Sequence, residues 1–219
     1  MIWALGIFLY ICHCKPIIPF DMNKISIAFL IALVPVLCHA QKEIGFGYGY
    51  SPLVYEQTDG NATANYHTPY RGVYASFTTK IVEISQNVHL RSGVLLSYGR
   101  YSDTEELDKE AYLNIPFDFR AEGKIKNIGV YCAVGPRLSY GLMSSVSPTG
   151  NKNASVNVYK SADYKRFDLM FGSNFGIVIK DMYIIQMSFD NGLLTRYKDT
   201  STGMKMTRLF YGIGAGIIF

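Results

Sequence analysis

Eight charged side chains are the residues of this chain whose types and spacing could do chemistry. Each lies on the polar side of a segment in which apolar residues alternate with polar or small ones. They are Lys80, Arg91, Asp118, Arg120, Arg137, Asp168, Asp190 and Arg208. Gathered in one enclosed space, such groups either pair with one another or act on a substrate. Buried charges must be paired, and a narrow interior is filled by its own side chains, so we expect a structural, salt-bridged interior, with Asp118 and Asp168 as the candidate partners of Arg137.

Two histidines are the other candidates for acid–base chemistry. His67 lies in a long polar connection and His89 lies beside a short turn, so the two are not expected to meet. An outer-membrane lipid-modifying enzyme, in which His67 acts with a loop Ser or Asp, is kept as an alternative function. The preferred interpretation is a protein with no catalytic residue, no cofactor and no metal site.

An acidic run between two of the segments could in principle bind a divalent cation. It lacks the glycine and the ligand spacing of a calcium loop, so a solvated loop is the preferred interpretation. The run consists of Asp103, Glu105, Glu106, Asp108 and Glu110.

The elements that must position these residues are strands. In the terminal segment 207–219, every second residue from Leu209 to Phe219 is apolar, whereas Arg208 and three glycines occupy the other face. A period of two over about ten residues, ending on an aromatic residue, is typical of a transmembrane β-strand. Seven further segments alternate in the same way: 44–50, 73–81, 88–98, 112–120, 128–140, 167–177 and 183–190. The pattern predicts an all-β fold, an eight-stranded antiparallel up-and-down transmembrane β-barrel.

The connections between these segments alternate between short and long. Short links are expected at 86–87, 123–127 and 180–181, and long polar ones at 56–68, 102–109, 145–164 and 198–205. Short turns on one side and long loops on the other are the outer-membrane arrangement, with both termini on the periplasmic side. Tyrosines near strand ends, at positions 50, 98, 140 and 183, are expected to form interfacial girdles.

The N-terminal segment of the sequence predicts that the protein is exported from the cytoplasm. Met22 and Lys24 precede an apolar run from Ile25 to Leu37, and a small residue, Ala40, follows. This pattern indicates a secretory signal peptide cleaved after Ala40, and we expect Met22 to be the true start. We therefore expect residues 1–40 to be a leader and residues 41–219 to be a single outer-membrane barrel domain.

Composition argues against a disulfide-stabilised protein and against a nucleic-acid-binding protein. Of the four cysteines only Cys132 lies after the leader, so no intrachain disulfide is possible in the processed chain. The formal net charge of +4 is too mild for a nucleic-acid-binding footprint.

The chain resembles the PorT-like outer-membrane β-barrel proteins that are common in Bacteroidetes. The resemblance is carried by residues 111–119 (AYLNIPFDF), similar to that family's Tyr-Leu-x-Ile-Pro strand, by Asp190-Asn-Gly-Leu193, and by terminal Phe219. It implies a barrel without an active site and, as an alternative function, an association with protein secretion across the outer membrane. The expected partners are outer-membrane lipid and lipopolysaccharide, the barrel-assembly machinery through the strand ending in Phe219, and secretion-system proteins.

Overall fold

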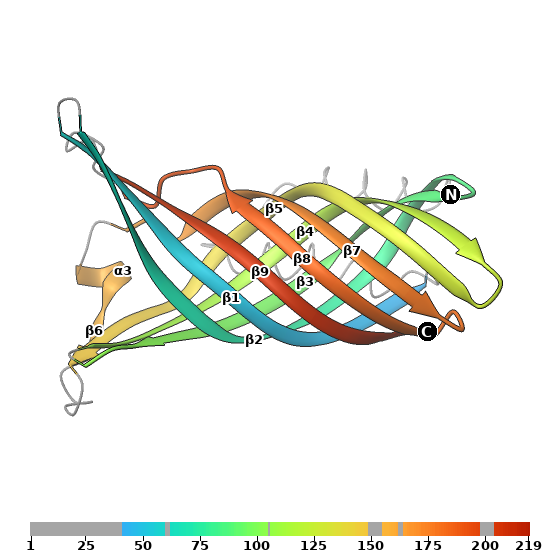
Figure 1. The fold of residues 1–219 in the computed structure, drawn as a ribbon, viewed down its shortest axis with the longest axis horizontal. Coiled ribbons are helices and arrows are strands. Elements are labelled where there is room, and N and C mark those ends of the chain that lie inside the picture. Colours follow the sequence, from blue (N-terminus) through green and yellow to red (C-terminus); the bar gives the residue numbers. More distant parts are fainter. Residues whose placement is uncertain (1–40, 60–61, 105, 149–154, 162–163, 198–203) are drawn as a thin grey trace, which may run out of the picture.

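Eight long antiparallel strands close into a barrel in a computed structural model of the chain (Figure 1). The structure describes residues 41–59, 62–104, 106–148, 155–161, 164–197 and 204–219. The leader expected over residues 1–40 lies outside the described residues. The long strands are β1 (Lys42–Asp59), β2 (Ala62–Ser85), β3 (Val88–Ser102), β4 (Glu106–Ile125), β5 (Ile128–Pro148), β7 (Phe167–Ile179), β8 (Tyr183–Gly192) and β9 (Met204–Ile218).

Each long strand pairs with its neighbour in the chain, and the first strand also pairs with the last. Glu43 lies opposite Ile218 in the closing pair, β1 with β9. The predicted eight-stranded up-and-down topology is therefore confirmed. Two small elements were not predicted: β6 (Val156–Asn157), which pairs with the end of β5, and a single-turn helix, α3 (Val158–Ser161).

The predicted inside and outside faces are also those of the structure. On β5, Val134 is 40% exposed whereas Arg137 is 2% exposed. On β9, the alternate residues Tyr211, Ile213 and Ile217 are all exposed. An exposed wall of this kind, made of alternating apolar side chains, matches the lipid-facing surface of a membrane barrel. Within the described residues, no helix is long and apolar enough to cross a membrane.

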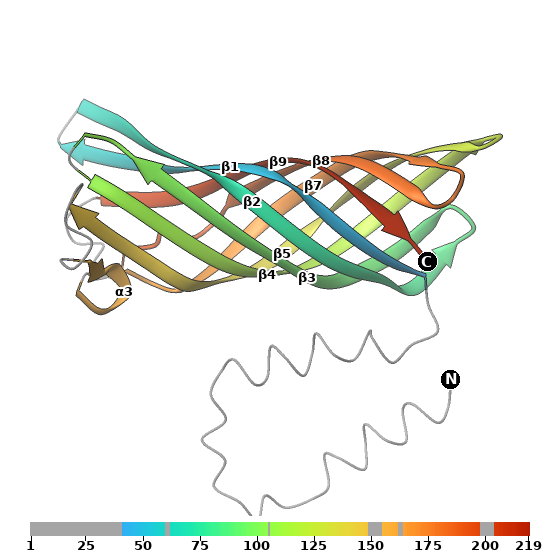
Figure 2. The ribbon, with the colours of Figure 1, turned by 90° about the horizontal axis from the view of Figure 1, so that it is seen from below.

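The strands reach further than expected at one end of the barrel. The β1–β2 ladder continues to the pair Asp59 and Ala62, so most of the connection predicted over 56–68 is strand. Likewise β4 begins at Glu106, inside the connection predicted over 102–109. These segments carry polar residues, so they lack the apolar alternation from which strands were predicted, but their backbones still pair. Figure 2 shows this extended end opposite the C-terminus.

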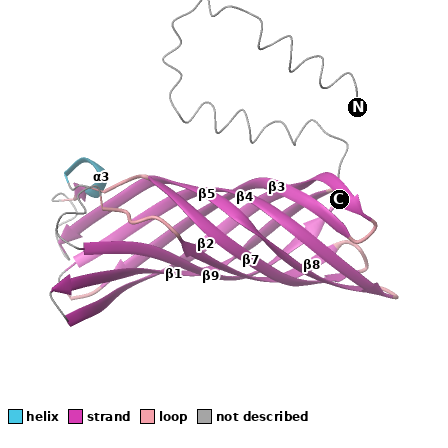
Figure 3. Cartoon of the chain, turned by 90° about the horizontal axis from the view of Figure 1, so that it is seen from above, coloured by secondary structure: helices cyan, strands magenta, loops and turns pink. Residues whose placement is uncertain are grey.

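The other end is closed by tight turns. Lys126, Lys180 and Asp181 take left-handed backbone conformations there, with φ between 54° and 57°. Such conformations let a turn of two or three residues reverse the chain. The C-terminus lies at the same end (Figure 3), as predicted for an even number of strands.

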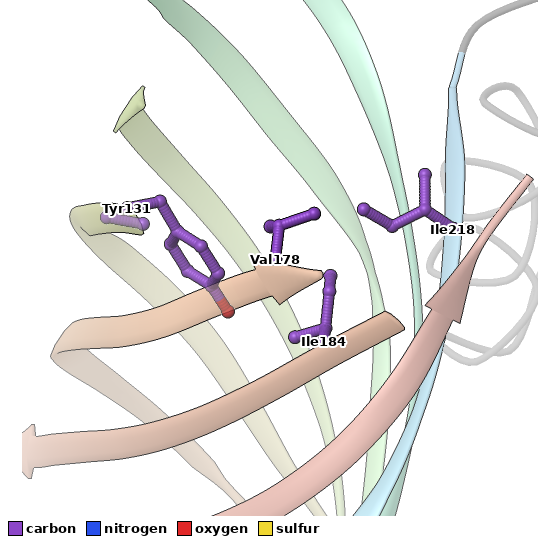
Figure 4. Close-up of a cluster of buried hydrophobic side chains, with 5 residues drawn as sticks. Tyr131, Val178, Ile184 and Ile218 are labelled. Carbon is purple, nitrogen blue, oxygen red and sulfur yellow. The ribbon is translucent and has the colours of Figure 1, made fainter. Parts of the chain in front are cut away.

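An apolar cluster fills the barrel interior near the tight turns. Val178, Ile184 and Ile218 project inward from three successive strands and lie beside Tyr131 (Figure 4). Their exposed fractions are 8%, 1% and 8%. The interior is thus not wholly polar, because apolar side chains pack together at this end.

We predict that the outward position Val134 does not tolerate a charge. A Val134→Arg variant should lose about 2–4 kcal/mol of folding free energy in a bilayer, because an arginine on the lipid face has neither water nor counter-ion. Refolding into lipid vesicles across a urea series measures this loss. Val134→Leu is the matched control and should refold as the wild type does. Equal stability of the arginine and leucine variants would mean that β5 faces the other way.

Candidate functional site

An ion-paired cluster occupies the middle of the barrel interior. Arg137 Nη1 lies 2.6 Å from Asp190 Oδ2, and its Nη2 lies 3.6 Å from Asp118 Oδ2. Asn174 Nδ2 donates a 2.9 Å hydrogen bond to the same oxygen of Asp118. All three charged side chains are at most 10% exposed. A buried guanidinium between two carboxylates is thereby compensated in a place that bulk water does not fill.

The partner of Arg137 differs in part from the prediction. Asp118 is a partner, but Asp190 rather than Asp168 supplies the short contact. Asp168 is buried and makes no ion pair with the described cations, and its chief electrostatic neighbour is Arg208. The tilt of strands in a closed barrel brings together side chains from β5 and β8, which are not adjacent. Alternation along one strand does not reveal that pairing.

A glycine on β7 makes room for this ion pair. A Cβ added to Gly172 would collide with Nε of Arg137 and would lie 2.5 Å from Oδ1 of Asp190. Gly172 thus leaves room for a large side chain that reaches across the interior from another strand. Any side chain at this position would push the arginine off its partner.

A second cluster lies toward the tight turns and is organised by Glu43. Its Oε2 contacts Arg91 at 3.1 Å and Arg120 at 2.8 Å. The guanidinium of Arg120 also stacks on the ring of Tyr131, 3.5 Å from its centroid. One carboxylate thus joins strands β1, β3 and β4 across the interior.

Sequence reasoning missed Glu43 and misplaced Lys80. Glu43 has the same parity as the inward glycines of β1, so extending the alternation by two residues would have found it. Lys80 was predicted to lie in the interior network. Its ammonium instead pairs with Glu83 at 2.7 Å, with 28% of the lysine side chain exposed. The long side chain reaches out past a register shift between Lys80 and Val82 at the barrel end.

No carboxylate of the described residues is in direct contact with Arg208 on β9. Its Nη2 donates hydrogen bonds of 2.9 Å to Asn114 Oδ1 and to Ser139 Oγ. The ring of Tyr112 lies under the guanidinium at 3.6 Å. Neutral acceptors and an aromatic face replace an ion pair at this position.

A third cluster fills the mouth at the extended end. Arg196, from the segment between β8 and β9, is 2% exposed. Its Nη1 lies 3.3 Å from Glu110 Oε1, and its Nη2 donates to the Tyr159 hydroxyl at 2.9 Å. Tyr112 donates a 2.5 Å hydrogen bond to the other oxygen of Glu110. The segment between β8 and β9 and helix α3 therefore lie in the mouth, where Arg196 contacts Glu110 of β4.

The acidic run is only partly the solvated loop that was predicted. Glu110 and Asp108 are buried, with exposed fractions of 3% and 8%. Both lie on β4 at the inward parity of Tyr112, so they point into the mouth rather than into solvent. Arg196 could not be found by periodicity, because it lies outside every strand of the described structure.

Tyr159 of α3 is also buried in the mouth, with 8% of its surface exposed. A Cβ on Gly141 would collide with its hydroxyl, so the helix packs directly against the backbone of β5. Burial raises the pKa of the Tyr159 hydroxyl, and the neighbouring Arg196 opposes the rise only in part. The hydroxyl therefore stays protonated at neutral pH and accepts the hydrogen bond from Arg196.

Little space remains between these clusters. The central cavity has a volume of ≈ 40 Å³ and is bordered by Glu43, Asp118 and Arg137. A smaller cavity of ≈ 10 Å³ lies below the mouth, beside Glu110 and Phe210. Spaces of this size hold a few water molecules and no organic substrate.

No catalytic arrangement is formed by the two histidines. His67 is exposed on β2 and has no polar partner among the described residues. His89 is buried near the opposite end, with its Nε2 3.7 Å from Glu122 Oε1. In the described part of the chain, no group of three or more His, Cys, Asp or Glu side chains could hold a metal ion.

We predict that Arg137 is energetically coupled to Asp190 and not to Asp168. Removing the short contact with Asp190→Asn should cost about 3 kcal/mol, since the guanidinium stays buried. In a double-mutant cycle, Arg137→Gln with Asp190→Asn should show a coupling of about 1–3 kcal/mol. The cycle with Asp168→Asn is the control and should be additive. Unfolding in urea measures both, and a larger coupling to Asp168 would contradict the observed pairing.

Comparison with known proteins places this barrel in a family. The sequence model of a family described as "Outer membrane protein beta-barrel domain" matches residues 43–194. The search of curated proteins found no match to the chain.

Several solved structures have a similar fold at low sequence identity. Ail, the attachment invasion locus protein of Yersinia pestis, is 13% identical, with a TM-score of 0.43 over 83% of this chain and 100% of that one. Neisserial surface protein A is 9% identical, with a TM-score of 0.49 over 81% and 97%. OprG from Pseudomonas aeruginosa is 11% identical, with a TM-score of 0.44 over 82% and 96%. The family match alone covers enough of the sequence to decide membership, and the chain belongs to the outer membrane protein beta-barrel domain family.

Proposed function

We propose that this outer-membrane protein is a closed, non-enzymatic barrel that acts through its surface, as a structural component or by binding a protein partner. The observation that carries the proposal is the filling of the interior along its length. From the tight turns outward, the interior holds the apolar cluster at Ile184, the Glu43 cluster, the Arg137 cluster and the Arg196 cluster.

The filled interior argues against transport by diffusion. An ion crossing the barrel would have to displace charge pairs whose side chains are almost fully buried, such as Arg137 with Asp190. It would also have to pass the packed apolar side chains at the other end. Eight strands enclose room for side chains and little else, unlike the wide channels of sixteen-stranded porins.

We predict no sizeable conductance when the purified protein is inserted in planar bilayers. The Arg196→Ala variant loses only the contacts of Arg196 with Glu110 and Tyr159. We expect it to be non-conducting as well, because the Arg137 and Glu43 clusters remain intact. A sixteen-stranded porin treated in the same way is the positive control. Stable nanosiemens-scale steps from the wild-type protein would refute the closed interior.

One class of partner is supported by the resemblance to PorT-like proteins. Among the residues that carry it, 111–119 lie on β4, which also contributes Asn114 and Asp118 to the interior clusters. We propose, on the sequence resemblance alone, that the partner is a component of a protein-secretion system. The signal peptide and its cleavage after Ala40 are part of the same proposal, since export is needed to reach the outer membrane.

Deletion of the gene tests the secretion role. We expect loss of secreted folded cargo in the deletion strain, restoration by the wild-type protein, and co-purification of the barrel with export components. Restoration by the Val134→Leu variant, which we expect to fold as the wild type does, controls for expression and assembly. Normal secretion in the deletion strain would dismiss this role and leave the structural one.

A further inference from the structure

Three cations form a row across neighbouring strands on the outer wall of the barrel. Arg71 on β2 lies directly opposite Arg100 on β3, and Arg100 lies directly opposite Lys109 on β4. Side chains that are opposite one another in antiparallel strands project from the same face, about 4.5–5.5 Å apart. The three positive charges are therefore immediate neighbours.

The row faces away from the interior. Arg71 and Arg100 are exposed and Lys109 is half-buried. The nearest carboxylates on β4 are Asp108 and Glu110, and both of these point into the barrel mouth. None of the three cations makes a hydrogen bond or ion pair with a residue in the described parts of the chain. Like charges placed directly opposite one another are destabilising. An anion from outside the protein would therefore stabilise this row.

From its position along the strands, we infer that the row lies near the outer surface of the membrane. Arg100 is two residues from the end of β3, and Lys109 is three residues into β4. Both positions are at the extended end of the barrel, which in outer-membrane barrels faces outward. Tyr98, 41% exposed and two residues closer to the barrel centre than Arg100, is placed as an interfacial aromatic residue.

An apolar groove begins directly below the row. It has a volume of ≈ 490 Å³, and its wall includes Val73, Tyr98 and Ala111. These are the next outward positions after Arg71, Arg100 and Lys109 on the same three strands. Its floor and far side are formed mainly by Phe46, Ala75, Leu96 and Leu142. The small side chains of Ala75 and Ala111 create the hollow between larger apolar neighbours.

We propose that Arg71, Arg100 and Lys109, together with the groove beneath them, bind a phosphorylated lipid of the outer leaflet. The lipid phosphate lies among the three cations, and one of its acyl chains lies in the groove. Guanidinium groups bind phosphate oxygens in bidentate fashion, and the lysine adds a point charge. A free phosphate would use the cations alone, whereas a lipid uses both halves of the site. This site is independent of whether the barrel interior is closed.

The test measures lipid retention by the purified full-length barrel using native mass spectrometry. The probes are lipid A carrying phosphate and lipid A of the same acyl chains from which phosphate has been removed. The wild-type barrel should retain the phosphorylated form in preference. The triple variant Arg71→Gln, Arg100→Gln, Lys109→Gln should lose about 100-fold in affinity for that form, since each cation near a membrane surface contributes about a factor of five. Its affinity for the dephosphorylated form should not change.

A charge-matched control removes three cations from the opposite end. Lys42→Gln, Lys126→Asn and Lys180→Asn change the net charge equally, and asparagine tolerates the left-handed backbone at the latter two positions. This control should bind as the wild type does. Filling the groove with Ala75→Leu and Ala111→Leu should lower the affinity for both lipids by about tenfold. This is the effect expected for the loss of about two methylene groups of contact. Inorganic pyrophosphate should compete only weakly with the lipid.

Three results would overturn the proposal. Undiminished retention of phosphorylated lipid A by the triple glutamine variant would show that the row is not the phosphate site. An equal loss in the charge-matched control would reduce the effect to net charge. Pyrophosphate binding as tight as that of the lipid, unaffected by filling the groove, would show an anion site without a lipid. Heat-modifiable gel migration confirms that each variant is a folded barrel before it is compared.

Discussion

The hydrocarbon layer of a membrane offers neither hydrogen-bond partners nor counter-ions, and this constraint determines where the polar groups of the chain lie. The backbone meets it by closing the sheet, with β1 paired to β9, so that no strand edge is left open to lipid. The side chains meet it by turning their charges inward. Val134 and Arg137, three residues apart on β5, illustrate the division between the two surfaces.

Turning charges inward creates a second requirement, because the interior is too narrow for bulk water. Among the described residues, five arginines and six carboxylates are buried, and lysine is absent from this set. Arginine suits such a place, since its planar group can stack on an aromatic ring while it donates hydrogen bonds. Arg120 over Tyr131 and Arg208 over Tyr112 both use this geometry. The interior is thus nearly neutral, with its arginines spaced along the barrel.

Alternation along each strand was enough to predict the strands and which of their side chains face inward. It predicted few of the side-chain contacts that cross the barrel interior. It predicts that Arg137 faces inward because each strand has only two faces. It does not predict that Asp190 is the near partner of Arg137, because that contact depends on how far the strands are sheared around the ring. Arg196 and Tyr159 lie outside the long strands, where no period exists to follow. Glu43 could have been predicted, because the alternation of β1 continues to this residue and places it on the inward face.

Closure between the first and last strands has a consequence for how the barrel forms. Glu43 and Ile218 are neighbours in space although almost the whole described chain separates them. A contact so distant in sequence carries a large loop-closure entropy and slows folding. Until β9 arrives, β1 also presents an unpaired edge that could join another chain. We therefore expect closure of the β1–β9 pair to be the slow step of folding, during which the open edge of β1 is exposed to other chains. A cellular factor that shields that edge would affect the yield of this protein more than its final stability.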